Sequence, residues 1–469
     1  MKIEFVTYMF LPQSTGGTQV YTNNIARALQ DSGHQVSLFA GDLETQQPVG
    51  SPRLHQVDYD GLLLNRLQFS WGSRSAYYGP QLLFNPDVYQ VTVDHWQENR
   101  PDLIHVTYCG HFSAAPLQAA VDLGIPVVMT ATDYWLICPI GTLLKRDDSL
   151  CMGRQSGTTC QQCIHGDTRV SQLMSYLPPT LQEGIVSASK QLNRFALTNG
   201  AIDLIGAVEA RNGTLPKLLN QVDLLFTPSR FMKDTLVAAG LINHERVHVF
   251  PHGHNIQRAM IGKHKSCSDK IRFGYTSNLA PIKGAHILIQ AFRELQTDSA
   301  SLTIYGNPNS YPDYAVQCRA LAQDDPRIVF AGAFNNERIG EILQDIDVLV
   351  VPSLWYENAP VTIAEAFVAK TPLIVTDLGG MAEAVEADVN GLRFPLGDAN
   401  RLAQQMQRFL DEPGLVQRFR LSIPEVRSVQ DEADALEGIY RQLIQGVPVN
   451  FPMNDQVNAS LVDKLVEFA

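Results

Sequence analysis

The sequence of 469 residues lacks any run of about 18 apolar residues free of charges and turn signals, the length that a helix needs to cross a bilayer. Its start, Met1–Val6, carries a basic residue and an early acid, and no apolar core of signal-peptide length. We therefore expect a cytoplasmic protein. Peripheral contact with the inner face of the membrane stays open, because amphipathic surface helices leave weak sequence signals.

Positive charge is also scarce. The chain has 36 Lys and Arg against 48 Asp and Glu, and its formal net charge is -12. Because an acidic chain binds nucleic acid poorly through its overall field, we expect no nucleic-acid partner. Hydrophobic residues make up 45% of the chain and charged residues 18%, an ordinary balance for globular domains. The length predicts two to three such domains.

Fingerprints of two enzyme classes are missing. No G-x-G-x-x-G motif with a distal acid follows a strand pattern, which argues against a nicotinamide oxidoreductase. No motif supports a pyridoxal-phosphate lysine, which argues against a phosphorylase.

Short apolar segments alternate with helical patterns in both halves of the chain, which is typical of parallel α/β units. Each segment is nearly all apolar, as expected of strands that are buried on both faces. The predicted strands are 3–7, 36–40, 103–106, 127–130 and 224–227 in the first half, and 271–275, 302–305, 328–330, 348–351 and 373–376 in the second. Helical patterns lie between them, among them 20–29, 286–295 and 339–344.

A polar stretch between the halves marks the predicted domain boundary. We predict an N-terminal domain over 1–255, a C-terminal domain over 256–446 and a tail over 447–469 that ends in a helix. Two segments fit the alternation poorly and are interpreted as insertions in the first domain. They are 59–97, which is aromatic and irregular, and 138–216, which holds a cysteine cluster.

Three predicted strands are followed by glycine-containing loops that open a helix. These are Gly16-Gly17, Pro281-Ile282-Lys283-Gly284 and Leu378-Gly379-Gly380. Backbone N–H groups at a helix N-terminus bind anions, and Lys283 would add a point charge suited to a diphosphate. The alternatives are simple tight turns at the glycines and a solvated surface lysine at Lys283.

The stretch Pro352–Glu365 carries two glutamates after a strong strand pattern. Carboxylates are good partners of sugar and ribose diols, because each offers two acceptor oxygens. Glu357 is predicted on a loop and Glu365 on the following helix, so together they could bind several hydroxyls. The alternative is a helix-capping Glu365 and an unrelated exposed Glu357.

These motifs, in their order and spacing, resemble the GT-B-fold retaining glycosyltransferases of family 4 over nearly the whole chain. The most specific match is Glu357…Glu365, which reproduces that family's E-x7-E signature. The supporting matches are Gly16-Gly17, Val222–Phe231, Pro251-His252-Gly253, Pro281–Gly284 and Leu378-Gly379-Gly380. The resemblance implies two facing Rossmann-like domains with a ligand cleft between them, and a hexosyltransferase activity that retains configuration.

The resemblance also implies roles in binding a UDP-, GDP- or ADP-linked sugar. Glu365 would bind ribose hydroxyls, and Glu357 would hold the sugar with help from backbone groups of Asn358, Ala359, Pro360 and Val361. Lys283 would neutralise the diphosphate, and Gly379 and Gly380 would contact the donor. Gly16 and Gly17 would face it from the first domain. Lys283 and Glu357 are the expected catalytic residues, and no cofactor is required for catalysis.

The sequence departs from the family pattern at three places, one of which is Gln19, where a glutamate often follows the glycine pair. Asn278 stands where members usually have an arginine of the diphosphate site, and Thr132 stands where a histidine usually precedes Asp133. We list His111, Thr132 and Asp133 as acceptor-side candidates, since His111 could supply the lost imidazole. These departures keep open an alternative in which the chain is a nucleotide-sugar-binding or partner subunit. The acceptor itself is not readable from the sequence.

Four cysteines form the pattern C-x12-C-x8-C-x2-C: Cys138, Cys151, Cys160 and Cys163. Four thiolates with a closing C-x2-C are compatible with a structural Zn²⁺ site, which would stabilise a loop too polar to build its own core. An iron–sulfur cluster, a disulfide and four ordinary reduced cysteines are the alternatives. The resembling branch often carries similar cysteines, which favours the metal.

Overall fold

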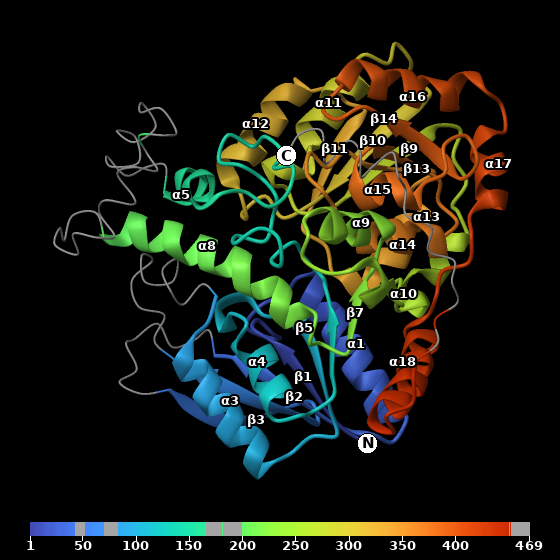
Figure 1. Cartoon of the computed structure of the whole chain (residues 1–469). Coiled ribbons are helices and arrows are strands. Elements are labelled where there is room, and N and C mark those ends of the chain that lie inside the picture. The colour runs from blue at the N-terminus through green and yellow to red at the C-terminus, as the bar shows by residue number, and fades with distance from the viewer. Residues whose placement is uncertain (43–51, 70–82, 166–180, 182–198, 450, 452–469) are drawn as a thin grey trace. The chain divides into compact units, whose positions relative to one another are not determined.

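The computed structural model describes residues 1–42, 52–69, 83–165, 181, 199–449 and 451. The chain forms two compact units, each built around its own β-sheet (Figure 1). The first unit comprises Met1–Pro228, Lys233–Phe250 and Ala433–Ala469, and the second comprises Ser229–Met232 and Pro251–Glu432. No helix among the described residues combines the length and the apolar character that crossing a membrane takes.

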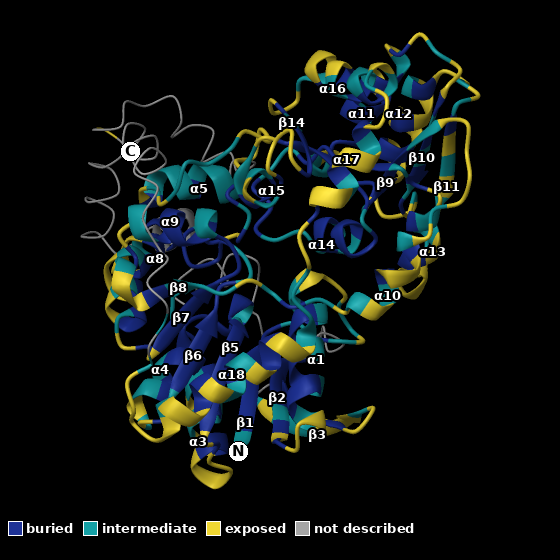
Figure 2. Cartoon of the chain, turned by 90° about the vertical axis from the view of Figure 1, so that its right-hand side faces the viewer, coloured by how far each residue is buried: buried dark blue, intermediate teal, exposed yellow. Residues whose placement is uncertain are grey.

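The sheet of the first unit has eight strands in the order β3-β4-β2-β1-β5-β6-β7-β8. Only β3 and β4 pair antiparallel, and the other neighbours are parallel. The strands are β1 (Lys2–Thr7), β2 (Gln35–Gly41), β3 (Arg53–Tyr59), β4 (Leu62–Gln68), β5 (Leu103–Tyr108), β6 (Val127–Thr130), β7 (Leu224–Thr227) and β8 (Val247–Val249). The five strands predicted for this half are all present, and their inner residues are buried (Figure 2).

Helices flank this sheet, and the first of them follows β1 directly. They are α1 (Gly17–Asp31), α3 (Pro86–Glu98), α4 (Ala115–Asp122), α5 (Gly157–His165), α8 (Asn199–Leu219), α9 (Arg230–Ala238) and α18 (Val429–Ile444), with short 3₁₀ turns at Gly110–Phe112 and His244–Arg246. The helix α1 extends beyond the predicted 20–29 at both ends, and Gly33, with a positive φ of 87°, allows the chain to turn back after it. The helix α5 packs against α8 through Cys160 and Ile164.

The sheet of the second unit has six parallel strands in the order β11-β10-β9-β12-β13-β14. They are β9 (Ile271–Thr276), β10 (Ala300–Tyr305), β11 (Ile328–Gly332), β12 (Val348–Val351), β13 (Leu373–Thr376) and β14 (Gly391–Phe394). The helices are α10 (Ile256–Met260), α11 (Ala285–Arg293), α12 (Pro312–Ala322), α13 (Ile339–Gln344), α14 (Val361–Val368), α15 (Gly379–Ala384), α16 (Ala399–Asp411) and α17 (Leu415–Ser422), with 3₁₀ turns at Ile261–Lys263, Pro281–Lys283 and Asn336–Arg338.

Both faces of this second sheet are covered by apolar side chains. Along β12, Val348 and Val350 belong to the core beneath α11, α12, α16 and α17. Their neighbours Leu349 and Val351 belong to the opposite core, beneath α10, α13, α14 and α15. Successive side chains of a strand point to opposite faces, so a strand between two helix layers must be apolar throughout. This explains why the strands of this half could be recognised from the sequence.

Two parts of the predicted domain organisation need correction. The segment 59–97 is not simply an insertion, because β4 pairs with β2 inside the sheet and α3 lies in the same stretch. The residues from 433 to 446, which include most of α18 and were predicted within the second domain, belong to the first unit. The predicted helix of the tail, from about Ala459, lies outside the described residues, as do parts of the predicted insertion 138–216.

Candidate functional site

The candidate site of the second unit lies in the loops that follow β9, β12 and β13. In this sheet β10 lies on one side of β9 and β12 on the other, so the chain reverses its direction of winding between β9 and β12. Open α/β sheets bind ligands beyond the carboxyl ends of their strands at such a reversal. The motif residues around Lys283, Glu357 and Gly379 are therefore placed where the topology favours a ligand.

Backbone contacts and glycines bring these three loops together. The N–H of Leu354 donates to the carbonyl of Ile282 over 2.8 Å, which joins the β12 loop to the β9 loop. Gly284 has a φ of 72°, and a Cβ there would overlap the carbonyl of Pro352. Gly380 likewise lies so close to the backbone of Asn358 that no Cβ would fit. The glycines thus permit a close packing of backbones that any other residue would prevent.

An ion pair lies at the centre of the joined loops. Nζ of Lys283 is 2.5 Å from Oε1 of Glu357. The same oxygen accepts hydrogen bonds from Oγ of Ser353 and from Nε1 of Trp355, each over 2.9 Å. Glu357 is 8% exposed, so these three donors offset the cost of burying its charge. Within the described residues, the second carboxylate oxygen, Oε2, receives no hydrogen bond and stays available.

The second glutamate of the motif occupies a different environment. Burial raises the pKa of Glu365 to about 7. The nearby charge of Arg258 and a hydrogen bond from Asn336 act in the opposite direction and lower this pKa. Nδ2 of Asn336 is 3.4 Å from Oε1 of Glu365, and Arg258 pairs with Glu337 over 2.6 Å. Glu365 is therefore a partly buried carboxyl beside a cation, with capacity for further hydrogen bonds.

The loop between the two glutamates leads into a helix with an open N-terminus. Asn358 is fixed because its Oδ1 accepts a hydrogen bond from Oγ of Ser229 over 2.8 Å. Pro360, which follows Ala359, is the N-cap residue of α14 and provides no side-chain cap. In the first turn, the N–H of Ile363 donates to the carbonyl of Pro360 over 3.0 Å, whereas no described hydrogen bond uses the N–H groups of Val361 and Thr362, which can bind an anion.

The glycine pair after β13 contributes differently from what the sequence indicated. The N–H of Gly380 donates to the carbonyl of Glu357 over 2.8 Å, so it holds the loop and is not directed at a ligand. Gly379 has a φ of 55°, which favours glycine. Asn278 is exposed, and its carbonyl accepts a hydrogen bond from the hydroxyl of Tyr275. No described contact ties the Asn278 side chain to Lys283.

In the first unit, the structure brings the glycine loop and the Thr132 segment together. Gly16 is the N-cap of α1 in an extended conformation, and a Cβ on Gly17 would meet no atom within 4 Å. Oγ1 of Thr18 donates to Oγ1 of Thr132 over 2.9 Å, and Thr132 in turn donates to the carbonyl of Thr107 over 2.8 Å. The hydroxyl of Thr132 is therefore used within the fold.

The other acceptor-side candidates are titratable groups near the same strand ends. Burial raises the pKa of Asp133 to about 7, although its carboxylate accepts a hydrogen bond from the N–H of Trp135 over 2.9 Å. Burial lowers the pKa of His111 to about 4, so this imidazole is neutral at pH 7. Its ring packs against Tyr8 with centroids 4.7 Å apart. His105 instead bonds to Tyr440 and Thr130 inside the first unit.

The four clustered cysteines share one cavity of about 570 Å³ in the first unit. Cys138 follows the Asp133–Trp135 motif, Cys151 lies on a short hairpin, and Cys160 and Cys163 lie one turn apart on α5. All four are reduced. No three or more His, Cys, Asp or Glu side chains in the described ranges are arranged as ligands of one metal ion. The four thiols line the same cavity, and the zinc site remains a prediction.

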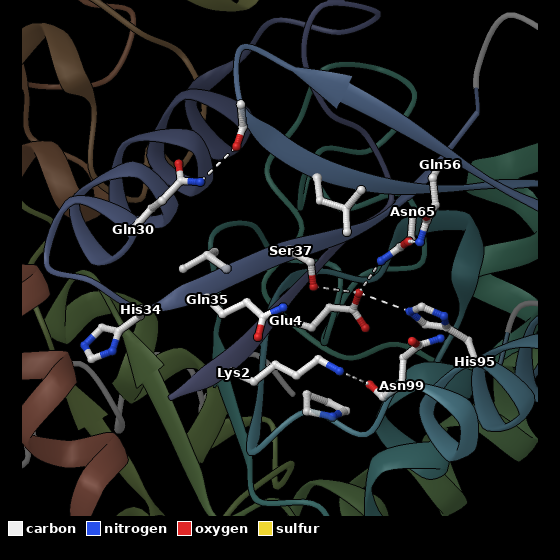
Figure 3. A pocket seen from close by; sticks show the side chains of 14 residues that line it. Lys2, Glu4, Gln30, His34, Gln35, Ser37, Gln56, Asn65, His95 and Asn99 are labelled. Carbon is white, nitrogen blue, oxygen red and sulfur yellow. Dashed lines mark hydrogen bonds and ion pairs between the residues drawn. The ribbon is translucent and has the colours of Figure 1, made fainter.

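A second polar cavity, of about 270 Å³, lies at the amino-terminal half of β1 (Figure 3). Its centre is Glu4, which is 2% exposed and accepts hydrogen bonds from Ser37, Asn65, His95 and Trp96. Burial raises the pKa of Glu4, but the charge and hydrogen bonds of His95 and the hydrogen bonds of Trp96 and Asn65 outweigh it, so the pKa is lowered. All of these partners lie on neighbouring strands and helices of the same unit. We therefore assign this carboxylate a structural role.

Several side chains at or near the candidate site were not singled out from the sequence. Ser353 and Trp355 lie inside the quoted motif, but no pattern said that they bind Glu357. Arg258 lies on α10, more than a hundred residues before Glu365. The hydroxyls of Thr276 and Thr376, at the ends of β9 and β13, are buried without a hydrogen-bond partner in the described part of the chain. A polar residue at the end of an apolar strand pattern is the sequence signal that could have identified Thr276 and Thr376.

The structure consists of two Rossmann-like α/β domains, and the second carries an ion pair, a partly buried carboxyl and a helix N-terminus in the segments that follow its strands. A family model described as "Glycosyl transferases group 1" matches residues 270–412, and one described as "Glycosyl transferase 4-like domain" matches residues 16–155. The chain belongs to the group 1 glycosyltransferases, and its fold is that of the GT-B glycosyltransferases.

Relatives of known name resemble parts of this chain. The alpha-D-kanosaminyltransferase of Streptomyces kanamyceticus is 26% identical over 193 residues, which are 40% of this chain and 50% of that protein. The chain thus spans about half the length of the curated relatives it matches.

Two solved structures share the fold. Sucrose-phosphate synthase of Thermosynechococcus elongatus has a TM-score of 0.62 and 18% identity, and Anabaena Alr3699/HepE in complex with UDP and glucose has 0.57 and 16%. Each alignment covers 95% of this chain and 99% of the other.

Proposed function

We propose that this chain is a retaining glycosyltransferase of family 4, which moves a sugar from a nucleotide-sugar donor to an acceptor in glycan, glycolipid or glycoside biosynthesis. The observation that carries the proposal is the group formed by Lys283, Glu357 and the open N-terminus of α14. A cation and helix N–H groups suit a diphosphate, and a carboxylate with one available oxygen suits a sugar hydroxyl. The UDP complexes of Anabaena Alr3699/HepE support a nucleotide ligand for this fold.

In this mechanism the bond between the anomeric carbon and the diphosphate oxygen breaks, and the electron pair leaves with the diphosphate. The acceptor oxygen bonds to the anomeric carbon on the same face, and its proton passes to the leaving phosphate. Lys283 stabilises the negative charge that grows on the leaving oxygen. Glu357 holds the sugar through Oε2, and Glu365 holds the ribose. No side-chain nucleophile and no metal at the diphosphate are part of the proposal.

The alternative is a nucleotide-sugar-binding or partner subunit without turnover. Asn278, which replaces the expected arginine, and Thr132, whose hydroxyl is engaged by Thr18 and Thr107, are the features that favour it. The intact Lys283–Glu357 pair favours the enzyme.

Donor hydrolysis distinguishes the two functions. The purified chain is incubated with UDP-glucose, ADP-glucose or GDP-mannose, and the released nucleoside diphosphate is measured. Slow release that is lost in the Lys283→Ala variant supports the transferase. Tight binding of a donor without release, whatever acceptor is added, supports the binding subunit.

A further inference from the structure

Trp355 contacts both members of the central ion pair. Its indole N–H donates to Oε1 of Glu357 over 2.9 Å, and its ring centroid lies 5.1 Å from Nζ of Lys283. The first contact is a hydrogen bond to a charged group, and the second is a cation–π contact. One side chain therefore touches the carboxylate and the ammonium at the same time.

The surrounding backbone fixes this tryptophan. The preceding residue, Leu354, is tied to Ile282 by a backbone hydrogen bond of 2.8 Å, and Tyr356 packs on Phe231 with ring centroids 5.2 Å apart. An indole is rigid, and its N–H is a donor only, so it can hold an acceptor in one place. Ser353 adds a second neutral donor to the same oxygen of Glu357.

These contacts divide the carboxylate of Glu357 into two different oxygens. Oε1 accepts hydrogen bonds from Lys283, Ser353 and Trp355. Oε2 receives none from the residues that the structure describes. A carboxylate held only by a flexible ammonium could rotate and offer both oxygens to it. The indole donor opposes this rotation, because it would lose its acceptor.

We propose that Trp355 is a positioning residue, which holds Oε1 of Glu357 so that Oε2 is presented to a hydroxyl of the donor sugar. The inference rests on the proposed function and adds to it a residue that controls how the sugar part of the donor is bound. Trp355 acts through Glu357, so its loss should weaken binding of the sugar and leave the contacts to the nucleoside diphosphate in place.

The test compares paired ligands by calorimetry: UDP with UDP-glucose, ADP with ADP-glucose, and GDP with GDP-mannose. The Trp355→Phe variant keeps an aromatic ring and removes the N–H. We expect it to bind the nucleotide sugar about tenfold more weakly, the effect of one hydrogen bond to a charged group, and the nucleoside diphosphate within about twofold of wild type. Ser353→Ala removes another donor to the same oxygen and should act in the same direction.

A double-mutant cycle decides whether Trp355 acts through Glu357. In a Glu357→Ala background, Trp355→Phe should change the affinity for neither ligand. The same tenfold loss in that background, or an equal loss for the nucleoside diphosphate and the nucleotide sugar, would overturn the inference. Wild-type protein that binds none of the six ligands would contradict the proposed function itself.

A ligand-free measurement checks the contact. In a ¹⁵N spectrum of the full chain, the indole N–H signal of Trp355 is assigned by its absence in Trp355→Phe. The signal should shift in Glu357→Gln, because a neutral amide accepts a weaker hydrogen bond than a carboxylate. An unshifted signal would overturn the inference even if donors bind.

Discussion

Nζ of Lys283 lies 2.5 Å from Oε1 of Glu357, although the two residues are 74 positions apart in the sequence. The lysine expected to neutralise a diphosphate and the glutamate expected to hold a sugar therefore form one ion pair. In the proposed reaction, Glu357 orients the ammonium before the donor arrives. Lys283 can still donate to a phosphate, because an ammonium has three donors and its described hydrogen bonds use one.

Lys283→Ala should lower donor turnover about 100-fold and change the affinity for the nucleoside diphosphate much less, because the charge acts mainly on the leaving oxygen in the transition state. Release of nucleoside diphosphate from the donor measures turnover, and calorimetry measures affinity. Lys270→Ala, which removes an exposed lysine of the same unit, is the control and should match wild type. Equal losses of affinity and turnover in Lys283→Ala would assign the lysine to ground-state binding instead.

Nucleotide binding should depend on pH through Glu365. Its pKa is raised to about 7 by burial, so the carboxyl is largely protonated at pH 6 and largely ionised at pH 8. The ionised form is the better acceptor for ribose hydroxyls, so affinity should strengthen as the pH rises from 6 to 8. Calorimetric titrations with a nucleotide sugar, whose phosphates do not titrate between pH 6 and 8, should give a flat profile for Glu365→Gln. Glu294→Gln, at an exposed position, should keep the wild-type slope.

The buried cluster around Glu4 predicts a stability effect in the first unit. Glu4→Gln should lower the free energy of unfolding by about 1–3 kcal/mol at pH 7, because a neutral amide cannot satisfy all the donors directed at the carboxylate. The pKa of Glu4 is lowered in the folded state, so the stabilisation is present above the unfolded pKa of about 4.3 and is lost as the pH falls through the folded value.

Urea denaturation of wild type and Glu4→Gln at several pH values measures this difference. It should shrink at acid pH, and Glu98→Gln, at an exposed position on α3, should show none. A difference of the same size at every pH would show that the ionised carboxylate is not its source.

The cysteine cavity predicts a metal content. Protein purified without chelators should contain stoichiometric zinc if the four thiols are a structural site, and Cys160→Ser/Cys163→Ser should lose both the metal and thermal stability. Cys267→Ser changes an exposed cysteine of the second unit and should retain the metal. Protein free of stoichiometric zinc or iron would assign the four cysteines to ordinary reduced thiols.

The sequence predicted ten of the fourteen strands that the structure describes and missed β3, β4, β8 and β14, as well as contacts between distant residues. The strands 348–351 and 373–376 were recognisable because burial on both faces requires apolar residues throughout. The strand β4 was missed because it contains Asn65 and Arg66, which are buried through hydrogen bonds to residues that a local pattern does not reveal. The second domain was predicted to extend to 446, which assigns most of α18 to the wrong domain. An amphipathic pattern shows that a helix has one buried face, but it does not show which sheet that face covers.

The candidate site was likewise predicted in part: its residue types could be read from the sequence, and their contacts could not. The residue types of the motif indicated a diphosphate and hydroxyl site, but the pairing of Lys283 with Glu357 and the hydrogen bond from Trp355 required the fold. Neither glycine of the first pair has a positive φ, because Gly16 is extended and Gly17 begins α1. In that loop the open space around Gly17 is the feature that remains compatible with a ligand.

A thermal-stability screen against nucleoside diphosphates and nucleotide sugars tests the proposed nucleotide-sugar site of the second unit. A ligand that binds only the folded state raises the melting temperature, and a tighter ligand raises it more. We expect a clear rise with one nucleotide and its sugar, which Glu365→Ala reduces. If no member of the panel raises the melting temperature, the proposed function is wrong, and a chain whose donor site has been lost is favoured.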